Sequence, residues 1–298
     1  MYDVVIIGAG PAGLSAGIYA CRGGLKVAII ENKSVGGQAQ TAADIQNYPG
    51  IKSTSGFDLC YAMMNQCIEF GAEFIFDSIT SVSLIDETKA IGLASGKVVE
   101  AKNVIIASGA NARKLGVPNE SKFIGKGVSY CATCDGAFFK GKTVAVIGGG
   151  NTAAEDALYL EKLAKKVYMV HRRDALRADD ILVKRLEKSN VEIVWDSVVE
   201  NLGGEDKITQ LTLKNVKTNA LTTISVDGVF VAIGQTPNSQ GFENISLSSG
   251  GYIITDENMH TNIDKVYAVG DVREKSLRQV VTACADGAIA ANAIVNGI

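Results

Sequence analysis

The sequence predicts an α/β fold with two Rossmann-like, three-layer domains, the second inserted into the first. Three observations support this prediction. Apolar segments that end in glycine recur along the chain, two of them lead into glycine-rich loops, and a length of 298 residues suits two domains. Hydrophobic residues make up 47% of the chain, which is enough apolar material for two cores.

Charge and hydropathy limit the possible partners and location. The net charge of −3 argues against nucleic acid or an anionic membrane surface as the main partner. No apolar run approaches the roughly 20 residues that a membrane span needs, and Val4–Ile7 lacks the basic flank of a signal peptide. Six cysteines in a chain of this size do not suggest a disulfide framework. We therefore expect a cytoplasmic protein.

The first 31 residues read as a strand, a loop, a helix and a second strand. The strands are expected at Tyr2–Ile7 and Lys26–Ile30, with a helix over Pro11–Arg22. The loop between them is a GxGxxG sequence from Gly8 to Gly13, which is typical of nucleotide-binding domains. Its glycines allow a tight turn, a close approach of the backbone to a pyrophosphate, and close helix packing. Glu31 follows the second strand, where a carboxylate can bind ribose hydroxyls.

The same unit recurs in the middle of the chain. Strands are expected at Thr143–Ile147 and Lys166–Val170, with a helix over Asn151–Leu163. The loop Gly148–Ala153 is a GxGxxA variant. His171 follows Gly148 by 23 residues, the same separation as between Glu31 and Gly8. Two such units in one chain imply two nucleotide sites.

A basic cluster occupies the ribose position of the second unit. Arg172 and Arg173 follow His171, and Arg177 lies one helical turn later. A carboxylate at this place would repel the 2′-phosphate of NADP, whereas guanidinium groups bind it through charge-assisted hydrogen bonds. The pattern predicts NADPH as the second nucleotide.

The remaining strand signals complete the two domains. Further apolar strands lead into Gly109, Gly234 and Gly270, where ligands of parallel sheets bind. Crossovers between the domains are expected at Ala112–Asn119 and Thr236–Glu243, each with a proline and polar neighbours. Antiparallel strands are expected over residues 78–99 and 191–226.

Cys131 and Cys134 form a CxxC motif. Cysteines at this spacing reach each other across one helical turn, and a nearby helix N-terminus makes one thiol a better nucleophile. Zinc is the alternative, but the chain has no second CxxC and only two histidines, His171 and His260, so we expect no metal. Asp135 follows the motif and is either a proton carrier for thiol–disulfide exchange or a helix cap. The other four cysteines are expected to pack as small hydrophobic residues.

The order of these motifs resembles that of the bacterial low-molecular-weight thioredoxin reductases over essentially the whole chain. The most specific matches are Cys131–Gly136, Gly148–Ala153, His171–Arg177, Ala268–Asp271 and Arg278–Gln279. The resemblance implies a homodimer that reduces thioredoxin with electrons from NADPH through FAD. It implies that Cys134 faces the flavin and Cys131 attacks thioredoxin, while the inserted domain rotates about its two linkers.

The resemblance also implies a division of the cofactors and their contacts. Residues 1–112 and 244–298 would bind FAD, and residues 113–243 would bind NADPH and carry the CxxC. The expected FAD contacts are Gly8, Gly10, Pro11, Ala12, Gly13, Glu31, Asn32, Gly36, Gly37, Gln38, Asn47, Gly109, Gly270, Asp271, Val272, Arg278, Gln279 and Val280. The expected NADPH contacts are Gly149, Gly150, Asn151, Thr152, Glu155, His171, Arg172, Arg173, Arg177, Ile233 and Gly234.

Two alternative functions share parts of this pattern. One is another flavin enzyme with a CxxC, either a ferredoxin-dependent thioredoxin reductase or a dithiol oxidase. Relatives of that kind tend to lack the basic 2′-phosphate cluster. The other is a non-catalytic, redox-sensing flavoprotein, which the complete second nucleotide loop disfavours.

Overall fold

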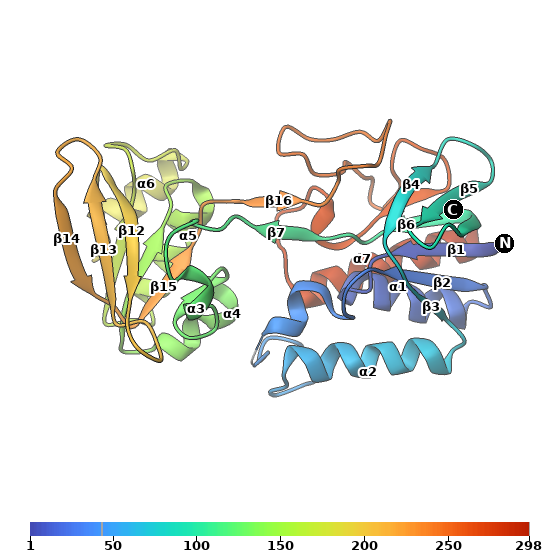
Figure 1. Cartoon of the computed structure of the whole chain (residues 1–298), viewed down its shortest axis with the longest axis horizontal. Helices are drawn as coiled ribbons and strands as arrows, with labels where there is room; N and C mark the ends of the chain where they lie inside the picture. Colours follow the sequence, from blue (N-terminus) through green and yellow to red (C-terminus); the bar gives the residue numbers. More distant parts are fainter. Residues whose placement is uncertain (43, 298) are drawn as a thin grey trace. The chain divides into compact units, whose positions relative to one another are not determined.

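The computed structural model describes residues 1–42 and 44–297, so Ile298, the last residue of the predicted first domain, lies outside the described residues. The chain forms two compact units (Figure 1). The first contains Met1–Asn111 and the segment from Thr236 onward, and the second is Ala112–Gln235. The second unit is therefore inserted into the first, and both are α/β, as the fold class predicted.

The two crossings lie close together in the fold. Strands β7 (Ala110–Ala112) and β16 (Gln235–Pro237) pair as a two-stranded sheet. The predicted return to the first domain was at residue 243/244, whereas the structure divides at 235/236. Hydrogen bonding explains the difference, because Asn238 already bonds to Ser108 through its side chain and to the carbonyl of Gly109 through its N–H.

The first unit is a seven-stranded sheet with helices on one face. The strand order is β3-β2-β1-β6-β5-β4, and β17 also pairs with β6. The strands are β1 (Tyr2–Ile7), β2 (Val27–Glu31), β3 (Glu73–Phe76), β4 (Ile79–Ser83), β5 (Lys89–Leu93), β6 (Val98–Ile106) and β17 (Val266–Ala268). The helices are α1 (Pro11–Arg22), α2 (Gly56–Glu69) and α7 (Val280–Asn296), with short 3₁₀ turns η1 (Gly37–Thr41) and η3 (Gly270–Val272).

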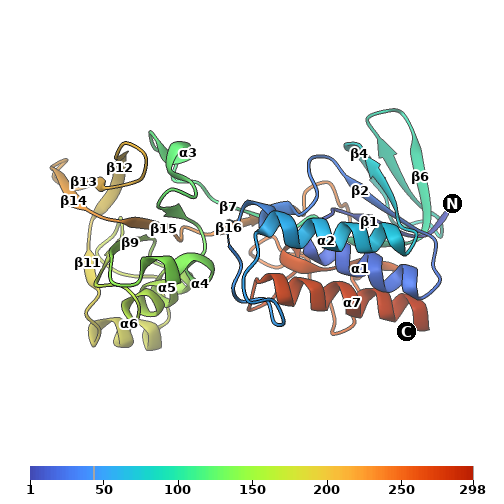
Figure 2. The same cartoon turned by 90° about the horizontal axis from the view of Figure 1, so that it is seen from below.

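Successive side chains of β1 point to opposite faces of this sheet and so belong to two different hydrophobic cores. Val4 and Ile6 pack with residues of α1, α2 and α7, whereas Val5 and Ile7 pack with residues of β5 and the 242–263 segment. Figure 2 shows the three helices lying along one face of the sheet. The β1 residues Val4–Ile7 are all apolar because both faces of a parallel strand are buried. Helices α1 and α7 meet so closely that a Cβ on Gly287 would lie 2.1 Å from the carbonyl oxygen of Ala12.

The second unit repeats this plan around a five-stranded parallel sheet of order β11-β10-β9-β15-β8. Its strands are β8 (Val128–Ser129), β9 (Thr143–Ile147), β10 (Lys166–Val170), β11 (Glu192–Val194) and β15 (Gly228–Val231). An antiparallel sheet of β12 (Ser197–Gly203), β13 (Gln210–Asn215) and β14 (Leu221–Ser225) contributes to the core on one side. The helical segments are α3 (Glu120–Phe123), α4 (Ala132–Asp135), η2 (Gly136–Phe139), α5 (Asn151–Glu161) and α6 (Asp180–Glu187).

One predicted set of strands needs a correction. Residues 191–226 were expected to form antiparallel strands, but β11 runs parallel to β10, with Met169 opposite Ile193. The reason is topological: β11 follows helix α6, and a strand that follows a crossover helix returns parallel to its neighbour. Over the described residues, no helix is both long and apolar enough to span a bilayer.

Candidate active site

The first glycine loop has two crowded positions and one open position. Gly8 has a positive φ of 106°, and a Cβ there would lie 2.5 Å from the carbonyl oxygen of Ala107. A Cβ on Gly13 would lie 2.0 Å from the carbonyl oxygen of Gly8. A Cβ on Gly10 would meet no atom within 4 Å. The fold therefore requires glycine at positions 8 and 13, while the space beside Gly10 suits a ligand such as a pyrophosphate.

Glu31 at the end of β2 is tied to this loop. One carboxylate oxygen accepts a hydrogen bond of 2.9 Å from the N–H of Ala9. The other accepts from the N–H groups of Asn32 and Lys33, each at 2.9 Å. These bonds fix the carboxylate beside the loop and leave it lone pairs for ribose hydroxyls.

Three residues predicted to contact FAD, Gln38, Asn47 and Gln279, form hydrogen bonds to residues far away in the sequence. The side-chain amide of Asn47 donates to Oε1 of Gln279 at 3.0 Å, and the amide of Gln38 donates to Oδ1 of Asn111 at 2.8 Å. Oδ1 of Asp271 is buried without a hydrogen-bond partner among the described residues. A buried acceptor that the protein leaves unpaired fits a bound hydroxyl group, as the ribityl chain of FAD would supply.

The second glycine loop has the same geometry as the first. A Cβ on Gly148 would lie 2.3 Å from the carbonyl oxygen of Ala232, whereas one on Gly150 would meet no atom within 4 Å. Asn151 is held by Asp179 through two reciprocal hydrogen bonds of 2.9 and 2.8 Å. The open position is therefore Gly150, which corresponds to Gly10 of the first loop, where a dinucleotide phosphate approaches the backbone.

His171 is buried in the structure, whereas Arg172, Arg173 and Arg177 are exposed. The His171 ring is only 5% exposed and lies against Gly149, where a Cβ would be 2.2 Å from the ring. Burial lowers the pKa of His171, and the charges of the nearby arginines lower it further. These effects outweigh a backbone hydrogen bond at Ala175 that raises the pKa and disfavour the charged imidazole, so the positive charge beside this loop comes mainly from the arginines.

The three guanidinium groups of Arg172, Arg173 and Arg177 are exposed on one loop. Within residues 1–42 and 44–297, none of them makes a side-chain hydrogen bond or an ion pair. The loop itself is anchored, because the N–H of Arg177 donates to the carbonyl oxygen of Gly149 at 2.7 Å. Three such donors beside a dinucleotide loop suit a phosphate dianion.

Cys131 and Cys134 form a disulfide at the start of helix α4. Sγ of Cys131 is the N-terminal cap of this helix and accepts a hydrogen bond from the N–H of Cys134 at 3.2 Å. Such a bond favours a thiolate over a thiol after reduction. Cys131 is half-buried and Cys134 is exposed.

Ser129 is a site residue that the sequence analysis missed. Its buried hydroxyl donates to Oδ2 of Asp135 at 2.6 Å and accepts from the N–H of Cys131 at 3.1 Å. Burial raises the pKa of Asp135, while the Ser129 hydrogen bond opposes the rise. One serine thus connects the CxxC backbone to the adjacent carboxyl group. No motif marks it, although it lies only two residues before Cys131.

The remaining cysteines lie outside this site. Cys60 and Cys67 are buried in the helix-side core of the first unit, and Cys21 and Cys284 pack against that core. Burial raises the pKa of Cys60 to about 11 and that of Cys67 to about 12, which keeps both as thiols. No cluster of three or more His, Cys, Asp or Glu side chains suited to a metal ion occurs in the part of the chain that the structure describes.

Two dinucleotide-type glycine loops and a CxxC disulfide are typical of a pyridine-nucleotide-dependent disulfide oxidoreductase. The sequence model of the pyridine nucleotide–disulphide oxidoreductases matches residues 2–287. A thioredoxin reductase of Treponema pallidum is 44% identical, covering 100% of this chain and 97% of that protein. One from Bacillus subtilis is also 44% identical, covering 99% and 94%. The crystal structure of a thioredoxin reductase from Streptococcus pyogenes superposes with a TM-score of 0.94 at 44% identity, covering 99% and 97% of the two chains.

The chain therefore belongs to the pyridine nucleotide–disulphide oxidoreductase family. It is an enzyme, and its cofactors are FAD and NADPH, as predicted. The resemblance to low-molecular-weight thioredoxin reductases is also confirmed. The open positions at Gly10 and Gly150, the unpaired oxygen of Asp271 and the exposed arginines all fit these two dinucleotides.

Proposed function

We propose that this chain is a thioredoxin-disulfide reductase that draws its electrons from NADPH. The observation that carries the proposal is the Cys131–Cys134 disulfide in the same unit as a complete dinucleotide loop. The full-length similarity to thioredoxin reductases supports thioredoxin as the disulfide substrate.

The chain's own residues have separable tasks in this reaction. In the first unit, the loop at Gly10 and the turn at Asp271 would hold FAD, which supplies two-electron transfer from NADPH to the disulfide. In the second unit, the loop at Gly150 would hold the NADPH pyrophosphate, and Arg172 and Arg173 its 2′-phosphate.

The exchange step follows from the cysteine geometry. Reduction of the Cys131–Cys134 bond adds two electrons and leaves a thiolate on Cys131, stabilised by the N–H of Cys134. This thiolate attacks one sulfur of the thioredoxin disulfide, and the other thioredoxin sulfur leaves as a thiolate. The thiolate of Cys134 then attacks Sγ of Cys131, which re-forms the disulfide and releases the second thioredoxin sulfur. Protonation gives the dithiol.

Asp135 is placed to handle protons in this exchange. Its carboxyl group follows Cys134 in the chain, and burial raises its pKa, while the Ser129 hydrogen bond opposes the rise. The hydroxyl of Ser129 fixes one of its oxygens. We assign to Asp135 the transfer of a proton to a departing thiolate.

The assembly and location belong to the same proposal. We infer a cytoplasmic homodimer whose second unit rotates about the 110–112 and 235–237 connections, so that the cysteines and the nicotinamide serve one flavin in turn. Phe57 and Tyr61 are exposed on α2, and their rings stack with a distance of 5.8 Å between the ring centroids. This pair offers apolar surface for a contact between subunits. Light scattering on the purified protein checks the dimer.

The alternatives explain fewer features of the molecule. A ferredoxin-dependent reductase or a dithiol oxidase does not bind NADPH, so neither function explains three exposed guanidinium groups beside the second loop. A non-catalytic redox sensor does not need a second dinucleotide site. The similarity to thioredoxin reductases does not favour either alternative.

One experiment tests the function. The purified protein is mixed with NADPH, and oxidation is followed at 340 nm with and without oxidised thioredoxin. We expect turnover only with thioredoxin, and slower turnover with NADH. Reduction by ferredoxin but not by NADPH would support the first alternative, and an absence of turnover with every donor would support the sensor.

A further inference from the structure

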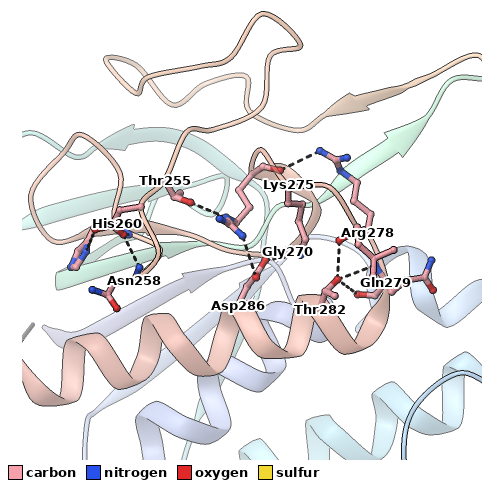
Figure 3. Close-up of polar contacts among 12 residues, drawn as sticks. Thr255, Asn258, His260, Gly270, Lys275, Arg278, Gln279, Thr282 and Asp286 are labelled. Carbon is pink, nitrogen blue, oxygen red and sulfur yellow. Dashed lines mark hydrogen bonds and ion pairs between the residues drawn. The ribbon is translucent and has the colours of Figure 1, made fainter. Parts of the chain in front are cut away.

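Asp286 is a buried carboxylate with no part in the predicted site. It lies on α7 among small residues and is 6% exposed. The helix is otherwise packed through residues such as Ala283, Gly287 and Ala290. A buried carboxylate is strongly unfavourable unless other groups pair with it. Figure 3 shows its side chain rising from α7 toward Gly270.

Three donors from one short segment satisfy this carboxylate. Oδ2 accepts from the N–H of Gly270 at 3.0 Å and from Nζ of Lys275 at 2.7 Å. Oδ1 accepts from Nη1 of Arg273 at 3.3 Å. The side chains of Lys275 and Arg273 are only 8% and 15% exposed, so these ion pairs are shielded from water. Asp286 therefore fixes the segment 270–275 against α7.

That segment carries the residue expected to bind the ribityl chain. Gly270 begins the turn η3 after strand β17 with a positive φ of 72°, and Asp271 follows it directly. Burial raises the pKa of Asp271, while the nearby charge of Lys275 opposes the rise. Holding the N–H of Gly270 thus sets where the unpaired Oδ1 of Asp271 lies.

Arg273 extends the same network to Arg278, which is expected to contact FAD. Its Nε donates to Oγ1 of Thr255 at 2.8 Å, and its carbonyl oxygen accepts from Nη2 of Arg278 at 3.3 Å. The Arg278 guanidinium also lies over the ring of Tyr252, 4.0 Å from its centroid. Two residues predicted to contact FAD, Asp271 and Arg278, are therefore placed by one cluster centred on Asp286.

We propose that Asp286 is a positioning residue for FAD, which holds the Asp271 turn directly and Arg278 through Arg273. This inference rests on the FAD site proposed above. A cluster that only stabilised the fold would change the melting temperature of the protein and leave its affinity for FAD unchanged. A positioning role changes the affinity itself and the environment of the bound flavin.

The test uses Asp286→Asn and Asp286→Ala in the full chain. Asparagine keeps the volume and an oxygen that accepts from Gly270, but it removes the charge that pairs with Lys275 and Arg273. Apo-protein is titrated with FAD to obtain the dissociation constant from quenching of flavin fluorescence. Visible circular dichroism of the bound flavin and thermal melting of the apo-protein are measured on the same samples.

Glu120→Gln is the matched control. Glu120 is a buried carboxylate of the second unit, 4% exposed, and it also has three donors: the N–H groups of Leu115 and Gly116 and the hydroxyl of Tyr130. Its loss should lower the melting temperature and leave FAD binding unchanged. The control therefore separates a general loss of stability from a loss of positioning.

We expect Asp286→Ala to weaken FAD binding about tenfold or more, because a buried charged hydrogen-bond acceptor is lost. Asp286→Asn should have a smaller effect in the same direction, with an altered flavin dichroism. If Asp286→Ala does not fold, the comparison of Asp286→Asn with Glu120→Gln decides. FAD constants within twofold of wild type for the Asp286 variants, or an equal loss in Glu120→Gln, would overturn the inference. Failure of the wild-type protein to bind FAD would instead overturn the proposed function.

Discussion

At the scale of single residues, the two glycine loops separate positions that the fold restricts to glycine from positions that it leaves open. Gly8 and Gly148 each face a backbone carbonyl, so a side chain there disrupts the sheet edge. Gly10 and Gly150 face open space, and neither has a positive φ, so the backbone accepts any residue at these positions. A substitution at an open position should therefore affect the cofactor rather than the fold.

Reciprocal substitutions test this assignment. Gly10→Arg should fold and bind NADPH but lack the yellow colour of FAD, because the side chain fills the space of the pyrophosphate. Gly150→Arg, its counterpart, should keep FAD and lose reduction by NADPH. Absorbance spectra and calorimetric titration measure both. If Gly10→Arg retained stoichiometric FAD, the first loop would be wrongly assigned.

Asp156 on α5 gives a prediction for stability against pH. Burial raises its pKa to about 7 from an ordinary value of 3.8, and the neighbouring Glu155 carboxylate adds to the rise. The folded state therefore holds a proton that the unfolded state releases, so stability falls as pH rises from about 4 to about 7. Asp156→Asn cannot ionise, and its stability advantage over wild type should grow across this window and then stay constant.

Thermal unfolding of wild type and Asp156→Asn at pH 4, 5.5, 7 and 8 measures the effect. The exposed Asp206, substituted in the same way, is the control for the loss of a carboxylate from the protein surface. A constant offset between Asp156→Asn and wild type at every pH would contradict the raised pKa.

At the scale of elements, the parallel strands could be predicted from the sequence, because each is marked by a local pattern of apolar residues followed by glycine. Strands such as Tyr2–Ile7 and Thr143–Ile147 end in an apolar run that leads into a glycine, and the structure has the same bounds. The direction of β11 could not be predicted in this way, because a three-residue strand carries no signal for its partner. Ser129 and Asp286 were missed for a similar reason: their partners lie on other elements, and one side chain carries no pattern.

The arginines in the loop after β10 are expected to determine the preference for NADPH over NADH. Replacing Arg172 and Arg173 with alanine should raise the KM for NADPH and leave that for NADH little changed. Each charge-assisted hydrogen bond contributes about 1.5–3 kcal/mol, so the loss per arginine is about ten- to hundredfold. Arg185→Ala, an exposed arginine on α6, is the control and should alter neither value. An equal loss with both cofactors would contradict the 2′-phosphate assignment.

At the scale of the whole molecule, the insertion of one unit into the other followed from the order of the motifs. The repeated loops placed two domains in the chain, and the late strand Val266–Ala268 returns to the sheet of the first unit beside β6. The exact crossing was not predictable, because Asn238 belongs to the first unit through hydrogen bonds to a segment 130 residues earlier. Contacts of this kind appear only when the chain is folded.

The central claim is that electrons reach thioredoxin through Cys131 and Cys134, with Cys131 as the attacking thiolate. The most direct measurement is the capture of the mixed disulfide. Cys134→Ser and Cys131→Ser are each incubated with thioredoxin that lacks its own resolving cysteine and carries a leaving group on the remaining one. The products are then analysed by non-reducing gels and mass spectrometry. We predict a one-to-one covalent complex through Cys131 in Cys134→Ser, no such complex in Cys131→Ser, and loss of thioredoxin turnover in both. A complex through Cys134 would reverse the roles, and full turnover in both variants would contradict the mechanism.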